Sequence, residues 1–150
     1  MSYGSCSTPK RPKDPGYPLQ LRRGLAVFQL GGIALGQERY EAALRDYRDS
    51  LRIVQEAGLI WNVPSALEAV GAIAHANGDS VRAARLLGAG DALREAMKTP
   101  LTESERTDYD CTVRAARAAS GEDAFSAAWT EGRAMSQGDA IAYALEEGQA

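Results

Sequence analysis

The stretch Leu30-Gly31-Gly32-Ile33-Ala34 is followed forty residues later by Val70-Gly71-Ala72-Ile73-Ala74, and this correspondence decides the fold. The match continues as Tyr40-x2-Ala43-x3-Tyr47-x2-Ser50 against Ser80-x2-Ala83-x3-Leu87-x2-Gly90, with every intermediate spacing kept. A repeat of this length is typical of stacked helix pairs. We expect the small residues, such as Gly31 and Gly71, where two helices cross closely, with Tyr47 and Leu87 filling the space beside them.

Apolar residues recur at every third or fourth position on both sides of the repeat, which is the period of a helix. Further along the chain, Thr102-Glu-Ser-Glu105 has the pattern of a capping box that opens a third helical region. Ser120-Gly121 interrupts this region, and Ser136-Gln-Gly-Asp139 opens a last short helix. The sequence therefore predicts an all-α fold of seven helices: about three antiparallel pairs and a C-terminal capping helix.

Composition places this fold in one folded domain. The chain has 150 residues, of which 25% are charged, and a formal net charge of −3. Residues 1–18 hold four of the six prolines. Because such a mixture buries little apolar surface, we expect a flexible tail over 1–18 and the helical domain over 19–150.

The same composition limits the possible partners and the compartment. An acidic balance offers no basic stripe for nucleic acid, so we expect no direct nucleic-acid contact. No apolar run approaches the roughly 18 residues of a membrane span, so we expect no membrane partner. Cys6 and Cys111 lie far apart and form no paired motif. Reduced thiols in a cytoplasmic protein are the simplest interpretation.

Motifs for catalysis or metal binding are missing from the sequence. Gly31, Gly32 and Gly36 lie close together, but no Lys-Ser/Thr follows them as a phosphate-binding loop requires. His75 is the single histidine and has no neighbouring ligand motif, so it predicts no metal site. We expect no catalytic residue, no metal and no cofactor, and hence a protein that is not an enzyme.

These spacings resemble the tetratricopeptide repeat (TPR), whose L-G-x2-Y…A-x3-F pattern they follow, with Ala34 and Ala74 at the usual tyrosine position. The segment from Ala83-Ala-Arg-Leu-Leu-Gly-Ala-Gly to Ala140-Ile-Ala-Tyr-Ala-Leu145 resembles the C-terminal TPR region of bacterial LuxR-type regulators and signalling ATPases. In that family the segment ends a helical superhelix behind an ATPase module. The resemblance implies a non-enzymatic protein–protein interaction or oligomerisation module. The alternative is a small-molecule or peptide-sensing regulatory domain.

In stacked helix pairs the first helix of each pair lines the concave wall, so its residues outside the packing stripe are groove candidates. We expect Phe28, Gln29, Glu68 and His75 to line a groove that binds a protein or peptide. In the sensing alternative, a small molecule sits near Phe28, Glu68 and His75.

The region from Leu19 to Leu35 is apolar around most of its circumference, although a terminal helix normally keeps one face wet. An exposed apolar patch of this kind is rare on monomers. We therefore expect a homodimer that forms through the N-terminal helix pair, with Leu21, Leu25 and Phe28 in the interface.

Overall fold

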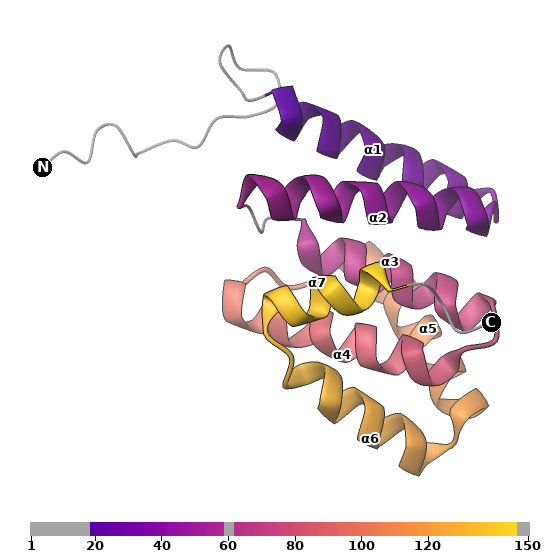
Figure 1. The fold of residues 1–150 in the computed structure, drawn as a ribbon. Coiled ribbons are helices and arrows are strands. Elements are labelled where there is room, and N and C mark those ends of the chain that lie inside the picture. Colours follow the sequence, from indigo (N-terminus) through magenta and orange to yellow (C-terminus); the bar gives the residue numbers. More distant parts are fainter. Residues whose placement is uncertain (1–18, 59–61, 147–150) are drawn as a thin grey trace, which may run out of the picture.

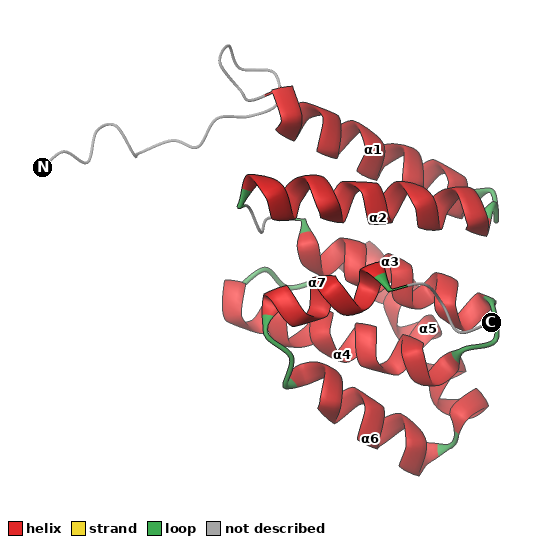
Figure 2. Cartoon of the chain, in the orientation of Figure 1, coloured by secondary structure: helices red, strands yellow, loops and turns green. Residues whose placement is uncertain are grey.

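The computed structural model describes residues 19–58 and 62–146; of residues 19–21 it describes the backbone alone. Every regular element in these ranges is an α-helix, which confirms the expected all-α class (Figure 2). The predicted tail over residues 1–18 lies outside the described residues. The seven described helices are α1 (Leu19–Gly36), α2 (Tyr40–Ala57), α3 (Val63–Ala76), α4 (Ser80–Met97), α5 (Glu103–Ser120), α6 (Glu122–Arg133) and α7 (Gln137–Leu145).

The first four helices form two antiparallel pairs, in which α1 packs along α2 and α3 along α4 (Figure 1). A Cβ atom placed on Gly31 would lie 3.1 Å from the Tyr47 ring, so α1 approaches α2 closely at this glycine. At the equivalent place in the second pair, a Cβ atom on Gly71 would lie 3.4 Å from Leu87. The small and large residues of the repeat therefore meet as the sequence predicts.

The two turns inside these pairs share one hydrogen-bond pattern. The backbone N–H of Arg39 donates to the carbonyl of Ala34 at 2.8 Å, and the N–H of Asp79 donates to that of Ala74 at 2.8 Å. The residue directly before each of these N–H donors has a positive φ: 59° at Glu38 in the first turn and 91° at a glycine in the second turn. The forty-residue period is thus present in the backbone as well as in the side chains.

The third predicted pair forms differently from the first two. The expected capping box is present at the start of α5, where Thr102 N–H donates to Glu105 Oε1 at 2.9 Å and Glu105 N–H donates to Thr102 Oγ1 at 3.2 Å. However, α6 packs mainly along α4 and contacts α5 much less. The reason is a close backbone approach: a Cβ on Gly88 of α4 would lie 2.4 Å from the carbonyl oxygen of Trp129.

Helix α7 returns to the first two pairs instead of capping the end of the stack. It contacts α2, α3 and α4 and buries Ile141 and Ala144 in the same core as these helices (Figure 1). Arg48 donates from Nε to the carbonyl of Ala144 at 3.2 Å, and Arg82 donates from Nη2 to that of Tyr143 at 2.8 Å. Cationic side chains at a helix C-terminus stabilise its unpaired carbonyls. The C-terminal helix is therefore an integral part of the fold.

Candidate functional site

A cleft of about 300 Å³ lies on the face of the molecule formed by α1, α3 and α5. A second hollow of about 570 Å³ adjoins it and shares four lining residues, Leu35, Ala72, Asp108 and Thr112. We call the two together the concave groove. Its walls come mainly from α1, α3 and α5, with a few residues from α2 and α4, and no residue of α7 lines it.

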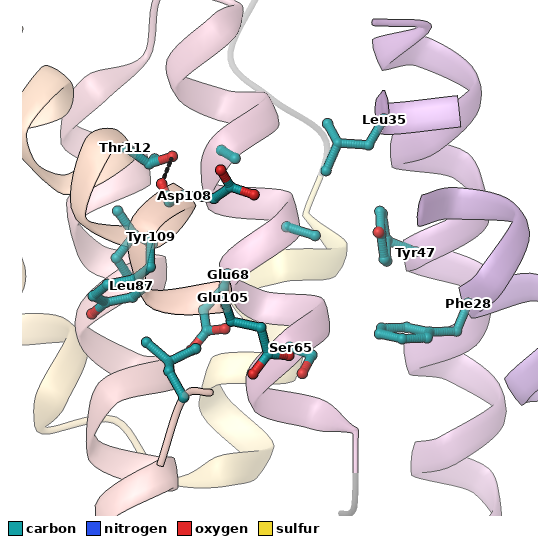
Figure 3. Close-up of a pocket in the computed structure, with 13 residues that line it drawn as sticks. Phe28, Leu35, Tyr47, Ser65, Glu68, Leu87, Glu105, Asp108, Tyr109 and Thr112 are labelled. Atoms are coloured by element: carbon teal, nitrogen blue, oxygen red, sulfur yellow. Dashed lines mark hydrogen bonds between the residues drawn. The ribbon is translucent and has the colours of Figure 1, made fainter. Parts of the chain in front are cut away.

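Apolar side chains from the first helix pair form one wall of the concave groove (Figure 3). Phe28 is half-buried, and its ring meets Tyr47 edge-on with the ring centroids 5.5 Å apart. Leu35 lies farther along α1 and lines both halves of the groove. Aromatic pairs in this geometry add to the stabilisation from burial, so this wall is fixed in shape.

Glu68 of α3 lies at the groove but is held by Arg94 of α4. Arg94 donates to the two carboxylate oxygens at 2.6 and 2.8 Å, and its Nη2 also donates to Ser65 Oγ at 3.0 Å. Both charged side chains are only 13% exposed. Burial raises the pKa of Glu68, and the hydrogen bonds from Arg94 oppose this rise only in part. Glu68 therefore holds α3 against α4, and its charge is neutralised within the fold.

Helix α5 supplies the opposite wall, which is polar (Figure 3). Glu105, Asp108, Tyr109 and Thr112 all line the cleft from this helix. The hydrogen bonds that Glu105 accepts from Thr102 lower the pKa of its carboxyl. The hydroxyl of Tyr109 is buried without a hydrogen-bond partner among the described residues, and burial raises its pKa.

Three of the four predicted groove residues line the concave groove, but they are not equally free to bind. Phe28 and Glu68 line the cleft, and His75 lines the adjoining hollow, where its Nδ1 lies 3.0 Å from Ser80 Oγ. Gln29 is exposed on α1 and lines neither part of the groove. Of the four, Phe28 is thus the residue whose position suits direct contact with a ligand.

The residues expected to mediate self-association differ from the large apolar residues that are exposed on α1. Leu25 and Phe28 are half-buried, and the side chain of Leu21 lies outside the described part of the chain. The large apolar residues that face solvent on α1 are Leu30, which is 55% exposed, and Ile33, which is 57% exposed. Among the described side chains of α1, these two therefore form the exposed apolar surface.

The residues of the polar α5 wall were not among the groove residues predicted from the sequence. Its members Glu105, Asp108, Tyr109 and Thr112 follow the i, i+3, i+4, i+7 spacing of one helix face. The repeat is weak in this region, and the predicted groove candidates come only from the two pairs in which the repeat is clear. The spacing itself could have indicated a common face.

Two negative findings apply to the part of the chain that the structure describes. No group of three or more His, Cys, Asp or Glu side chains there is arranged to hold a metal ion. None of the described helices is both long and apolar enough to cross a membrane.

Comparison with known proteins shows a similarity to transcriptional regulators. Two proteins from Mycobacterium tuberculosis strains and one from Mycobacterium bovis are each 33% identical to this chain over 122 residues. All three are named, on a provisional basis, as HTH-type transcriptional regulators. The match covers 81% of this chain but 14% of each relative, so the chain spans a small part of their length. No family model and no solved structure matches the chain.

Proposed function

We propose that this chain is a TPR-like helical repeat that acts without catalysis, as a protein-binding module of the kind found in bacterial transcriptional regulators. The observation that carries the proposal is the concave groove, whose walls come mainly from α1, α3 and α5. It is open and elongated, with an apolar wall on α1 and a polar wall on α5. A groove of this kind suits a peptide or a helix from another protein.

The similarity to transcriptional regulators supports a regulatory role for this chain. Those relatives are named as HTH-type transcriptional regulators, but this chain corresponds to 14% of their length. Its net charge of −3 does not favour contact with DNA. In the proposed role the chain binds another protein, or another part of a regulator, and leaves DNA recognition to a different module.

A library of displayed random peptides tests whether the groove binds peptides. Ala72 of α3 is half-buried and lines both parts of the groove, so Ala72→Phe fills it. Ala127 of α6 is exposed and lines neither part, so Ala127→Phe is the matched control. We expect peptides selected on the natural chain to lose binding to the first variant and to keep binding to the second. Equal binding to both variants would show that peptides bind elsewhere.

We also propose that the chain forms a homodimer through its N-terminal helix pair, centred on the exposed Leu30 and Ile33. Exposed leucine and isoleucine on one helix face are typical of a surface that another chain covers. Light scattering after size-exclusion chromatography should give twice the 16.0 kDa chain mass. Ile33→Asp should reduce this to a monomer, whereas Ala127→Asp should not. A natural chain that stays monomeric at high micromolar concentration would refute the dimer.

A second candidate function, sensing of a small molecule, is favoured by one observation. The Tyr109 hydroxyl is buried beside the cleft without a partner among the described residues, which leaves a donor for a ligand. A ligand raises the free energy of unfolding by RT ln(1 + [L]/Kd), so metabolites can be screened by thermal shift. A shift that Tyr109→Phe abolishes would favour sensing, and a screen with no shift would leave protein binding as the function.

A further inference from the structure

The residues of the concave groove that carry a full charge at neutral pH are carboxylates. Glu68, Glu105 and Asp108 line it, together with His75, and no lysine or arginine is among the described lining residues. Arg94 approaches from the α4 side, where Glu68 neutralises it. The charge that the groove presents to an occupant is therefore negative.

Asp108 is the carboxylate best placed to act on an occupant. Glu68 is occupied by Arg94, and the Glu105 carboxylate accepts a hydrogen bond from the backbone N–H of Thr102. Asp108 is exposed and forms no ion pair within the described residues, and it lines both halves of the groove. It is also placed across the groove from Leu35, on the other wall (Figure 3).

We propose that the occupant of the concave groove is a segment of a partner protein that carries both apolar and cationic side chains. Its apolar side chains would contact Phe28 and Leu35 on the α1 wall, while a lysine or arginine would pair with Asp108, and secondarily with Glu105, on the α5 wall. This inference rests on the proposed function, because it specifies the chemistry of the segment that the groove binds. Charge complementarity of this kind selects a partner and speeds its association.

The test uses two short amphipathic peptides with the same leucine pattern, one with lysine and one with glutamate at the polar positions. Their binding to the full chain is measured by fluorescence anisotropy at low and at physiological salt. Asp108→Lys is compared with Asp123→Lys, because Asp123 is exposed on α6 and forms no ion pair in the described part of the chain. The two variants have the same net charge, so only the position of the new lysine differs.

We expect the natural chain to bind the lysine peptide and to bind the glutamate peptide at least about tenfold more weakly, a difference of about 1.4 kcal/mol. Asp108→Lys should weaken the lysine peptide by about tenfold and strengthen the glutamate peptide. Asp123→Lys should change both by less than about twofold, because charges beyond a Debye length of about 8 Å are screened at physiological salt. Unchanged melting curves would show that both variants fold.

The outcomes separate this inference from the proposed function. If Ala72→Phe abolishes peptide binding but Asp108→Lys has no more effect than Asp123→Lys, the groove binds peptides without a preference for cations and the inference is wrong. Preference for the glutamate peptide would also overturn it. If neither peptide binds and Asp108→Lys instead dissociates a dimer, the occupant is a second copy of the chain, which again overturns it. If Ala72→Phe changes nothing, the proposed function itself fails.

Discussion

The close approach of α4 and α6 gives a stability prediction with a definite sign. A Cβ atom on Gly132 would lie 2.0 Å from the carbonyl oxygen of Arg85 and 2.8 Å from the carbonyl carbon. Carbon and oxygen atoms that are not bonded lie about 3.3 Å apart or more, even in close helix contacts. Because the obstructing atoms belong to backbone, Gly132→Ala must push the two helices apart by roughly 1.3 Å, as these contact distances require.

The cost of this displacement exceeds the intrinsic benefit of alanine. Overpacking of a well-packed interface typically costs about 1–3 kcal/mol, and because backbone atoms obstruct here we take the upper end, about 3 kcal/mol. The displacement also loosens the packing of Phe125 and Ala128 against Ala84, residues that are at most 1% exposed. Alanine in place of glycine in a helix contributes about 1 kcal/mol in the opposite direction. We expect a net loss of about 2 kcal/mol, or roughly 4–8 °C in melting temperature for a chain of this size.

Urea unfolding followed by far-UV circular dichroism measures this effect, with Gly138→Ala as the control. Gly138 is also helical, but a Cβ atom there meets nothing within 4 Å, so its replacement should raise stability by about 0.5–1 kcal/mol. Gly88→Ala should resemble Gly132→Ala, because its Cβ would lie 2.4 Å from a backbone oxygen. Equal urea midpoints for the natural chain and Gly132→Ala would refute the reasoning.

Three further predictions concern single side chains. Thr102→Ala removes the hydroxyl that accepts a hydrogen bond from Glu105 N–H at the start of α5, and it should lower the free energy of unfolding by about 1 kcal/mol. Urea titration measures this loss, and Ser104→Ala, at an exposed neighbouring position, is the control. Glu38 has a positive φ of 59°, so Glu38→Gly should raise the melting temperature, whereas Glu41→Gly inside α2 should lower it. Calorimetry measures both melting temperatures. Arg94→Met leaves the buried carboxylate of Glu68 unpaired and should lower the free energy of unfolding by about 3–5 kcal/mol. The additional Glu68→Met change should restore most of this loss. Equal losses in the single and double variants would contradict this prediction.

Features that depend on nearby residues could be predicted from the sequence. The capping box at Thr102 and Glu105 forms with both of its hydrogen bonds. The approach of Gly31 to Tyr47 follows from a repeat in which small and large residues keep fixed spacings. In each case the residues that decide the feature belong to one helix pair or one helix end, so local periodicity and capping chemistry determine the outcome.

Contacts between distant segments could not be predicted in the same way. Nothing near Gly132 in the sequence indicates that its partner is Arg85, 47 residues earlier. Glu68 looked like a free groove residue because its partner, Arg94, belongs to the next helix and carries no distinctive spacing. The α5 wall was overlooked for the same reason, since the groove exists only after three helices are stacked. The site therefore depends on tertiary contacts, although each helix that forms it was expected.

The glycines of α1 indicate which side of this helix faces α2. This helix is apolar on most sides, so periodicity alone does not indicate which side faces α2. Its glycines do: a Cβ on Gly24 would lie 3.0 Å from Ile53, and one on Gly31 would lie 3.1 Å from Tyr47. At 3.6 residues per turn, positions seven apart share a face, while Ile33 lies nine positions from Gly24 and therefore on the opposite side. The glycine pair thus explains why Ile33 faces solvent on α1.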